Sequence, residues 1–148
     1  MPIVFQLITS FIAAAGFAIL FNAPRQTLIQ CGIVGMLGWI VYYLLVQHDL
    51  DSVPATIIAA ILVGVLSRLC ASYFKKPIII FYIGGIIPLV PGGMAYNAMR
   101  HFVENDYLNG VELTTKVILI AASIALGLMF SEVTHKVIRT SLDKVKPT

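Results

Sequence analysis

The sequence predicts an all-α integral membrane protein with about five transmembrane helices, the fourth of which is discontinuous at a Pro-Gly-Gly break. Of the 148 residues, 59% are hydrophobic and 11% are charged, and the mean hydropathy is +0.92, well outside the range of soluble domains. Apolar stretches recur along nearly the whole chain, so we expect residues 1–148 to form a single transmembrane domain. Two prolines and two glycines interrupt one of these stretches.

A transmembrane helix needs about 20 mostly apolar residues to cross about 30 Å of hydrocarbon. Four segments reach this length directly: residues 3–21, 27–46, 53–74 and 113–133. Residues 78–90 would rise only about 20 Å as a helix, so we expect them to cross together with residues 94–103. The first segment has no positive region before it and no clear cleavage site after it, so we expect a membrane helix and not a signal peptide. Residues 134–148 are expected to form a tail.

The charged residues predict an orientation. In a five-span arrangement one side carries eight of the ten Lys and Arg residues: Arg25, Arg68, Lys75, Lys76, Lys136, Arg139, Lys144 and Lys146. Cytoplasmic loops carry an excess of Lys and Arg, so we expect an outside N-terminus and a cytoplasmic C-terminus. The cations are scattered and form no basic patch, which argues against nucleic-acid binding. Cys31 and Cys70 lie in apolar stretches and match no metal motif, and we expect no cofactor, metal or catalytic residue.

Small residues recur four apart within the predicted helices. The pairs are Ala14 and Ala18, Cys31 and Gly35, Ala60 and Gly64, and Ala121 and Ala125. Such pairs let helix backbones approach closely in lipid. The alternative is that alanine and glycine are simply common in membrane helices. No internal repeat is apparent, so a repeat partner is expected on another chain.

The interruption of the fourth span is the most informative feature. Pro88, Pro91, Gly92 and Gly93 cluster within six residues. Proline removes a backbone donor, and glycine tolerates backbone angles that other residues avoid. An unsatisfied backbone group in hydrocarbon costs several kcal/mol, so such a break survives only when it is buried in protein or lines a wet cavity. The alternative is a kinked helix packed against its neighbours without a ligand.

A helix that restarts after the break would direct its first N–H groups and the positive end of its dipole at the break. Transporters use this arrangement to hold a substrate carboxylate near the bilayer centre. Tyr96 and Asn97 lie one turn further along and are expected to supply hydrogen bonds. Arg100 either balances the carboxylate or pairs with Glu104, four residues on.

Several other polar or flexible positions are secondary candidates. Gly84 and Gly85 form a possible second flexible point before the break. Arg68, near the end of the third span, either attracts an anion or extends to the lipid headgroups. Asn22 and Arg25, beside Pro24, have either a gating role or a place in a capped turn.

Proton coupling is a further option. Glu132 and His101 are the candidates on this chain, although the coupling residue can equally lie on a partner. A metal site at His101 and Glu104 lacks further ligands.

Three segments resemble a known family. "GFAILFNAPRQTL" at residues 16–28, "CGIVGMLGW" at 31–39 and "IPLVPGGMAYNAM" at 87–99 are similar to the threonine/serine exporter family, and specifically to its small split subunit of the YjjB type. The most specific part is the core IP-x-x-PG-x-x-AY. It is matched by Ile87, Pro88, Pro91, Gly92, Ala95 and Tyr96.

The resemblance implies a bacterial inner-membrane transporter made either from one chain of about ten crossings or from two proteins. The smaller protein would supply about five crossings, and a larger YjjP-like subunit the rest. The implied substrates are small carboxylates, namely threonine and serine in some members and succinate in the split pair. If the partner inserts in the opposite orientation, the two chains would form an inverted pair.

The leading hypothesis is therefore a subunit of a secondary transporter that exports small carboxylates by alternating access around the break. The second hypothesis is a membrane scaffold that stabilises another protein without transporting anything. An intramembrane enzyme ranks last, because no nucleophile and base pair is apparent.

Overall fold

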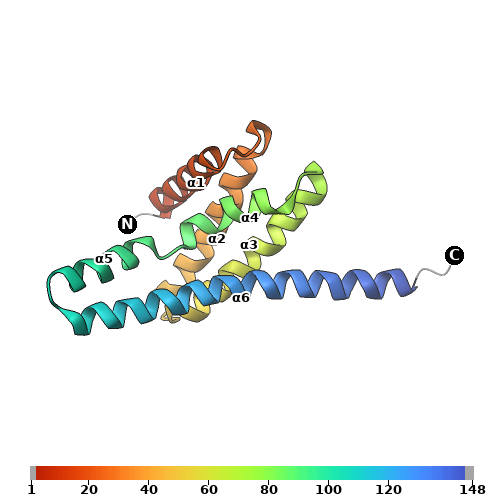
Figure 1. Cartoon of the computed structure of the whole chain (residues 1–148). Helices are drawn as coiled ribbons and strands as arrows, with labels where there is room; N and C mark the ends of the chain where they lie inside the picture. The colour runs from red at the N-terminus through yellow and green to blue at the C-terminus, as the bar shows by residue number, and fades with distance from the viewer. Residues whose placement is uncertain (1–2, 146–148) are drawn as a thin grey trace.

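The computed structural model of the protein describes residues 3–145, with side chains described as far as residue 137. Six α-helices and two short 3-10 turns follow one another along the chain (Figure 1). They are α1 (Ile3–Leu20), η1 (Arg25–Thr27), α2 (Leu28–Gln47), α3 (Ser52–Phe74), α4 (Ile78–Ile86), η2 (Ile87–Leu89), α5 (Gly92–Val103) and α6 (Tyr107–Val145). No strand occurs within residues 3–145.

The predicted all-α membrane class is confirmed. Four helices are long and apolar enough to cross a membrane, and the pair formed by Ile78–Leu89 and Gly92–Val103 makes a fifth candidate span. Helix α2 lies at the centre, against α1, α3 and α4, while α6 packs along α3 and α5. In Figure 1, α5 runs beside the first half of α6, away from α1 to α4.

Helix α6 is longer than the sequence predicts. It begins at Tyr107 instead of residue 113 and extends into the predicted tail as far as Val145. A helix of 39 residues is about 58 Å long, which exceeds the thickness of the hydrocarbon. Hydropathy marks the part of a helix that lipid surrounds, whereas the polar turns at either end keep their internal hydrogen bonds in water.

The helix ends share one turn geometry. The backbone is left-handed at Asn22, Asp49, Lys75 and Asn105. After α1, the Asn22 N–H donates to the Ile19 carbonyl and the Ala23 N–H donates to the Ala18 carbonyl, both at 2.9 Å. This Schellman motif satisfies carbonyls that would otherwise lack partners at the helix end and reverses the chain in few residues. Asn22 therefore has the structural role that the sequence analysis left as an alternative to gating.

Small residues hold the helices close together. A Cβ atom added to Gly35 would lie 2.5 Å from the Ala14 Cβ, and one added to Gly64 would lie 2.5 Å from the Ser131 Cβ. The members of three of the predicted pairs are buried, whereas Ala121 and Ala125 are exposed. On α6 the close approach to α3 is made instead by Gly127, which faces Ala60.

The fourth span is broken, as the sequence predicts, but the break lies slightly earlier. The helical segments on its two sides meet at an angle of 52°. Val90 is extended, with φ −65° and ψ 127°, because the residue before a proline is disfavoured in the helical region. Pro91 is the N-cap of α5, which begins at Gly92 and not at residue 94. The two glycines are therefore the first residues of the second half-helix and not part of the gap.

Substitution at Gly127 tests the close packing of α3 and α6. A Cβ at this position would lie 2.8 Å from the Ile57 carbonyl oxygen and 3.2 Å from the Ile61 amide nitrogen, and backbone atoms cannot move aside cheaply. We expect Gly127→Ala to lower the free energy of unfolding by about 1–3 kcal/mol, measured by unfolding in detergent micelles. Gly16→Ala is the matched control, because nothing lies within 4 Å of that Cβ position. Equal effects of the two substitutions would contradict the packing.

Candidate functional site

A cavity of about 190 Å³ lies at the break in the fourth span. The chain from Pro88 to Met94 forms one wall, and α2 and α6 supply the rest. The lining residues are Trp39, Tyr42, Pro88, Leu89, Val90, Pro91, Gly92, Gly93, Met94 and Ile120. Four of the seven residues predicted to bind substrate therefore lie together: Pro88, Pro91, Gly92 and Gly93.

Two backbone donors at the start of α5 have no backbone acceptor. The Gly92 N–H donates to the Val90 carbonyl at 2.8 Å, and the Ala95 N–H donates to the Pro91 carbonyl at 3.0 Å. Within the described part of the chain, the N–H groups of Gly93 and Met94 donate to no backbone carbonyl. Both residues line the cavity. The positive end of the α5 dipole and two free donors thus meet at this cavity, which is the arrangement that favours an anion.

Neither glycine is required for its backbone angles, because no glycine in the described residues has a positive φ. A Cβ added to Gly92 or Gly93 would have no heavy atom of this chain within 4 Å. The absence of side chains at these positions instead keeps space open beside the free amides. A ligand or a neighbouring chain can therefore approach the main chain closely here.

Trp39 forms the opposite wall and was missed as a site residue. Tryptophan and tyrosine near the ends of apolar spans are usually interfacial anchors, but Trp39 and Tyr42 are both partly buried and line the cavity. The Trp39 Nε1 donates to the Gln6 Oε1 at 2.8 Å, and the Trp39 and Tyr42 ring centroids are 5.3 Å apart. A signal was present in the sequence, because Gly35 and Gly38 precede Trp39 at helical spacing and bring this face of α2 against the fourth span.

A second cavity, of about 210 Å³, adjoins the same tryptophan. It is lined by Gln6, Thr9, Ser10, Ala13, Trp39 and Pro88. Trp39 and Pro88 line both cavities and therefore lie between them. The Ser10 hydroxyl donates to the Gln6 carbonyl at 2.7 Å, and the Thr9 hydroxyl donates to the Phe5 carbonyl at 2.9 Å. The oxygens of both hydroxyls still have acceptor capacity on this polar side of α1.

Comparison with known proteins matches residues 6–134 to the family model described as "Threonine/Serine exporter, ThrE". The chain belongs to the threonine/serine exporter family. A threonine/serine exporter of Corynebacterium glutamicum is 32% identical over 127 residues, which cover 86% of this chain and 26% of that protein. An uncharacterized protein of Haemophilus influenzae is 33% identical over 105 residues, 70% of this chain and 35% of that protein. No solved structure matches.

The chain thus spans between about a quarter and a third of the length of these relatives. The family assignment and the apolar helices together show a multi-pass membrane protein. The cavity at the break lies within the part that the exporter family model matches, because residues 39–120 fall inside residues 6–134.

The other three predicted binding residues of this exporter-family chain do not line the cavity. The Tyr96 side chain is 70% exposed, and Asn97 is also exposed. Arg100 pairs with Glu104 at 2.7 Å, which is the alternative that the sequence left open. It lies two turns of α5 beyond Gly92. The structure therefore separates the backbone donors at the break from the side chains that were expected to assist them.

Gly84 and Gly85 have a packing role in place of the expected flexible point. Helix α4 runs through both residues without interruption, and both are buried. An added Cβ would lie 2.6 Å from the Cys31 Cβ at Gly84 and 2.6 Å from a Val63 methyl group at Gly85. These two glycines fix the first half of the broken span against α2 and α3.

The remaining polar candidates lie away from the break. Arg25 is exposed in the turn η1. His101 Nδ1 lies 3.0 Å from Asp106 Oδ2 and so pairs with Asp106 instead of Glu104. The Asn109 amide donates to the same carboxylate oxygen at 2.7 Å. The pKa of Asp106 is lowered from its usual value, chiefly by the Asn109 hydrogen bond and further by His101.

A double-mutant cycle tests the contact that positions Trp39. Trp39→Phe removes the indole donor, and Gln6→Leu removes its acceptor at similar volume. We expect the free energy of unfolding in micelles to show a coupling of about 1 kcal/mol between the two substitutions, the typical net value of a hydrogen bond. Strict additivity of the two single changes would contradict the contact.

Proposed function

We propose that this chain forms part of a secondary transporter that exports small carboxylates, with the substrate carboxylate held at the start of α5. The observation that carries the proposal is the pair of free N–H groups, at Gly93 and Met94, beside a cavity inside a broken span. Discontinuous helices of transporters bind anionic groups in this way. The substrate would pass between the two sides of the membrane by alternating access around this fixed site.

The size of the cavity supports a small substrate. A volume of about 190 Å³ corresponds to about six water molecules in the liquid, which suits an amino acid or a short dicarboxylate. One relative carries the name threonine/serine exporter, and we propose threonine, serine or a dicarboxylate such as succinate as the substrate class. The Trp39 and Tyr42 rings would face the aliphatic part of such a molecule.

We further propose that a larger, YjjP-like membrane subunit completes the transporter. The chain spans 35% and 26% of the two relatives described above, so those proteins contain more than this unit. Helix α5 packs mainly against α6 and leaves Tyr96, Met99 and Val103 exposed, at 70%, 65% and 80%. These residues follow one another at helical spacing, and we propose that the partner covers the apolar stripe that they form.

The glycines at the start of α5 provide the main test. In the native host, which retains any partner, we expect Gly92→Leu and Gly93→Leu to reduce threonine, serine or succinate efflux at least about tenfold, the equivalent of about 1.4 kcal/mol. The leucine side chain would occupy the space beside the free amides. This chain leaves room for it, so its amount in the membrane and its assembly into the complex are expected to stay unchanged.

Gly16→Leu is the matched control, because Gly16 also has open space around its Cβ position but lies on α1, away from the break. Efflux is expected to stay normal in this variant. Loss of complex assembly together with efflux in the Gly92 variant would favour the scaffold hypothesis instead. Normal efflux in both α5 variants would exclude a substrate site at the start of α5.

We propose that the protein resides in the bacterial inner membrane with its N-terminus outside and its C-terminus in the cytoplasm. The excess of Lys and Arg on one side supports this orientation. A green fluorescent protein fused after Thr148 is expected to fluoresce, whereas alkaline phosphatase at the same point is expected to be inactive. An active phosphatase fusion would show that the orientation is the opposite one and would remove the basis for an inverted pair with the partner.

A further inference from the structure

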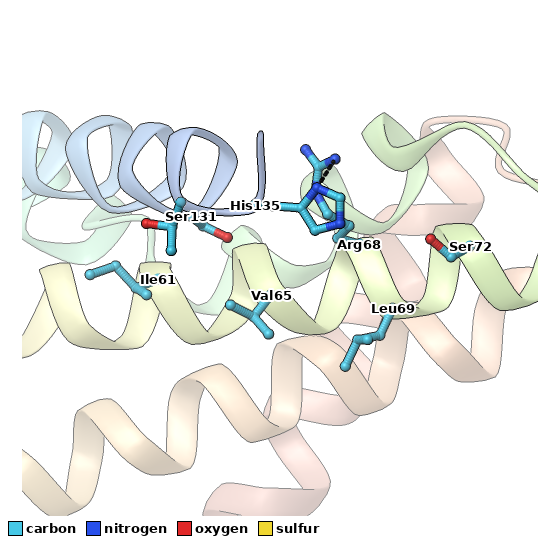
Figure 2. A pocket seen from close by; sticks show the side chains of 8 residues that line it. Ile61, Val65, Arg68, Leu69, Ser72, Ser131 and His135 are labelled. Carbon is cyan, nitrogen blue, oxygen red and sulfur yellow. Dashed lines mark hydrogen bonds between the residues drawn. The ribbon is translucent and has the colours of Figure 1, made fainter. Parts of the chain in front are cut away.

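A third cavity, of about 230 Å³, lies between α3 and α6 and shares no lining residue with the cavity at the break. Figure 2 shows Ile61, Val65 and Leu69 one turn apart along α3, and Arg68 meeting His135 of α6 beside them. The complete lining is Ile61, Val65, Arg68, Leu69, Ser72, Ser131, Thr134 and His135. The groove thus combines an apolar strip with a polar, cationic end.

The guanidinium of Arg68 is incompletely satisfied by this chain. Its Nη1 lies 3.3 Å from His135 Nδ1, and its Nη2 lies 3.7 Å from Glu132 Oε1. Its Nε is buried and has no hydrogen-bond partner among the described residues. An arginine within an apolar helix is expensive unless an anion or water compensates its charge. The exposed Glu132 carboxylate provides a long contact and leaves part of the guanidinium available.

Ser131 supplies a second and independent indication of a ligand. The residue is 4% exposed and lines the groove. Its hydroxyl has no hydrogen-bond partner within the described part of the chain. A buried hydroxyl without a partner loses the hydrogen bonds that it would make in water. A ligand oxygen in the groove would accept a hydrogen bond from this hydroxyl.

We propose that the groove binds an acidic phospholipid, with its phosphate at Arg68 and His135 and one acyl chain along Ile61, Val65 and Leu69. Arg68 lies six residues before the end of α3, which places its Cα about 9 Å inside that end. Its long side chain can reach the headgroup region from there.

The apolar strip distinguishes a lipid from a soluble anion. Val65 is 45% exposed and Leu69 is 62% exposed, and a small hydrophilic carboxylate would leave both uncovered. An acyl chain covers them while its headgroup occupies the polar end. Among the described residues, the charged and titratable groups that meet at this end are Arg68 of α3 and Glu132 and His135 of α6.

Native mass spectrometry of the purified full chain tests the proposal. The protein is equilibrated with equal amounts of phosphatidylglycerol and phosphatidylcholine that carry the same acyl chains. We expect the native sequence to retain phosphatidylglycerol preferentially and Arg68→Gln to reduce that preference about tenfold, because the substitution removes charge-assisted hydrogen bonds to the phosphate and not only a nearby charge. Lys76→Gln is the matched control: it removes one positive charge at the same end of the molecule but outside the groove.

Glu132→Gln distinguishes a specific change in lipid binding from a failure of a variant to fold. Removal of this carboxylate frees Arg68 and relieves repulsion of the phosphate, so the preference for phosphatidylglycerol is expected to rise, which misfolding cannot produce. The proposal is overturned if Arg68→Gln and Lys76→Gln have equal effects, or if Glu132→Gln leaves the preference unchanged. It is also overturned if inorganic phosphate at millimolar concentration displaces the lipid, because the groove would then bind a soluble anion.

Discussion

The architecture depends on the cost of an unsatisfied backbone group in hydrocarbon. Four of the five candidate spans are continuous helices and avoid this cost, whereas the broken span formed by α4, η2 and α5 does not. Its helix stops because Val90 is forced out of the helical region by Pro91, and the amides of Gly93 and Met94 then lack backbone acceptors. Such a defect is tolerated only where it meets a cavity or another polar group. The cavity beside Trp39 meets that condition, so the break and the cavity explain each other.

The two halves of the broken span are supported very differently. Helix α4 is held against α2 and α3 through Gly84 and Gly85, where any added side chain would collide with Cys31 or Val63. Helix α5 packs mainly against α6, and its first residues have open space around them. The first half is therefore fixed on two sides, whereas the start of the second half has open space beside its N–H groups. An anionic group can approach the α5 amides through that space without displacing α4.

The sequence predicts the fold class and the existence of the break, because both follow from local composition. It misses what depends on partners distant in the chain. A tryptophan near the end of a span usually lies at the lipid interface, but α1 brings Gln6 against the Trp39 indole. Gly84 and Gly85 suggest flexibility until Cys31 and Val63 are seen to fill the space beside them. From the sequence alone, Arg100 fits both a contact with a bound carboxylate and an ion pair with Glu104, and the structure shows the ion pair.

The proposed carboxylate site and the proposed lipid site attract anions by different means, and the difference suits their tasks. None of the ten residues that line the cavity at the break carries a charge. Its attraction comes from peptide dipoles, equivalent to about half a charge at a helix N-terminus. A substrate that must leave on the far side is better served by this weak field than by a full charge. Arg68, near a helix end, carries a full charge; a lipid held there has no need to be released in each transport cycle.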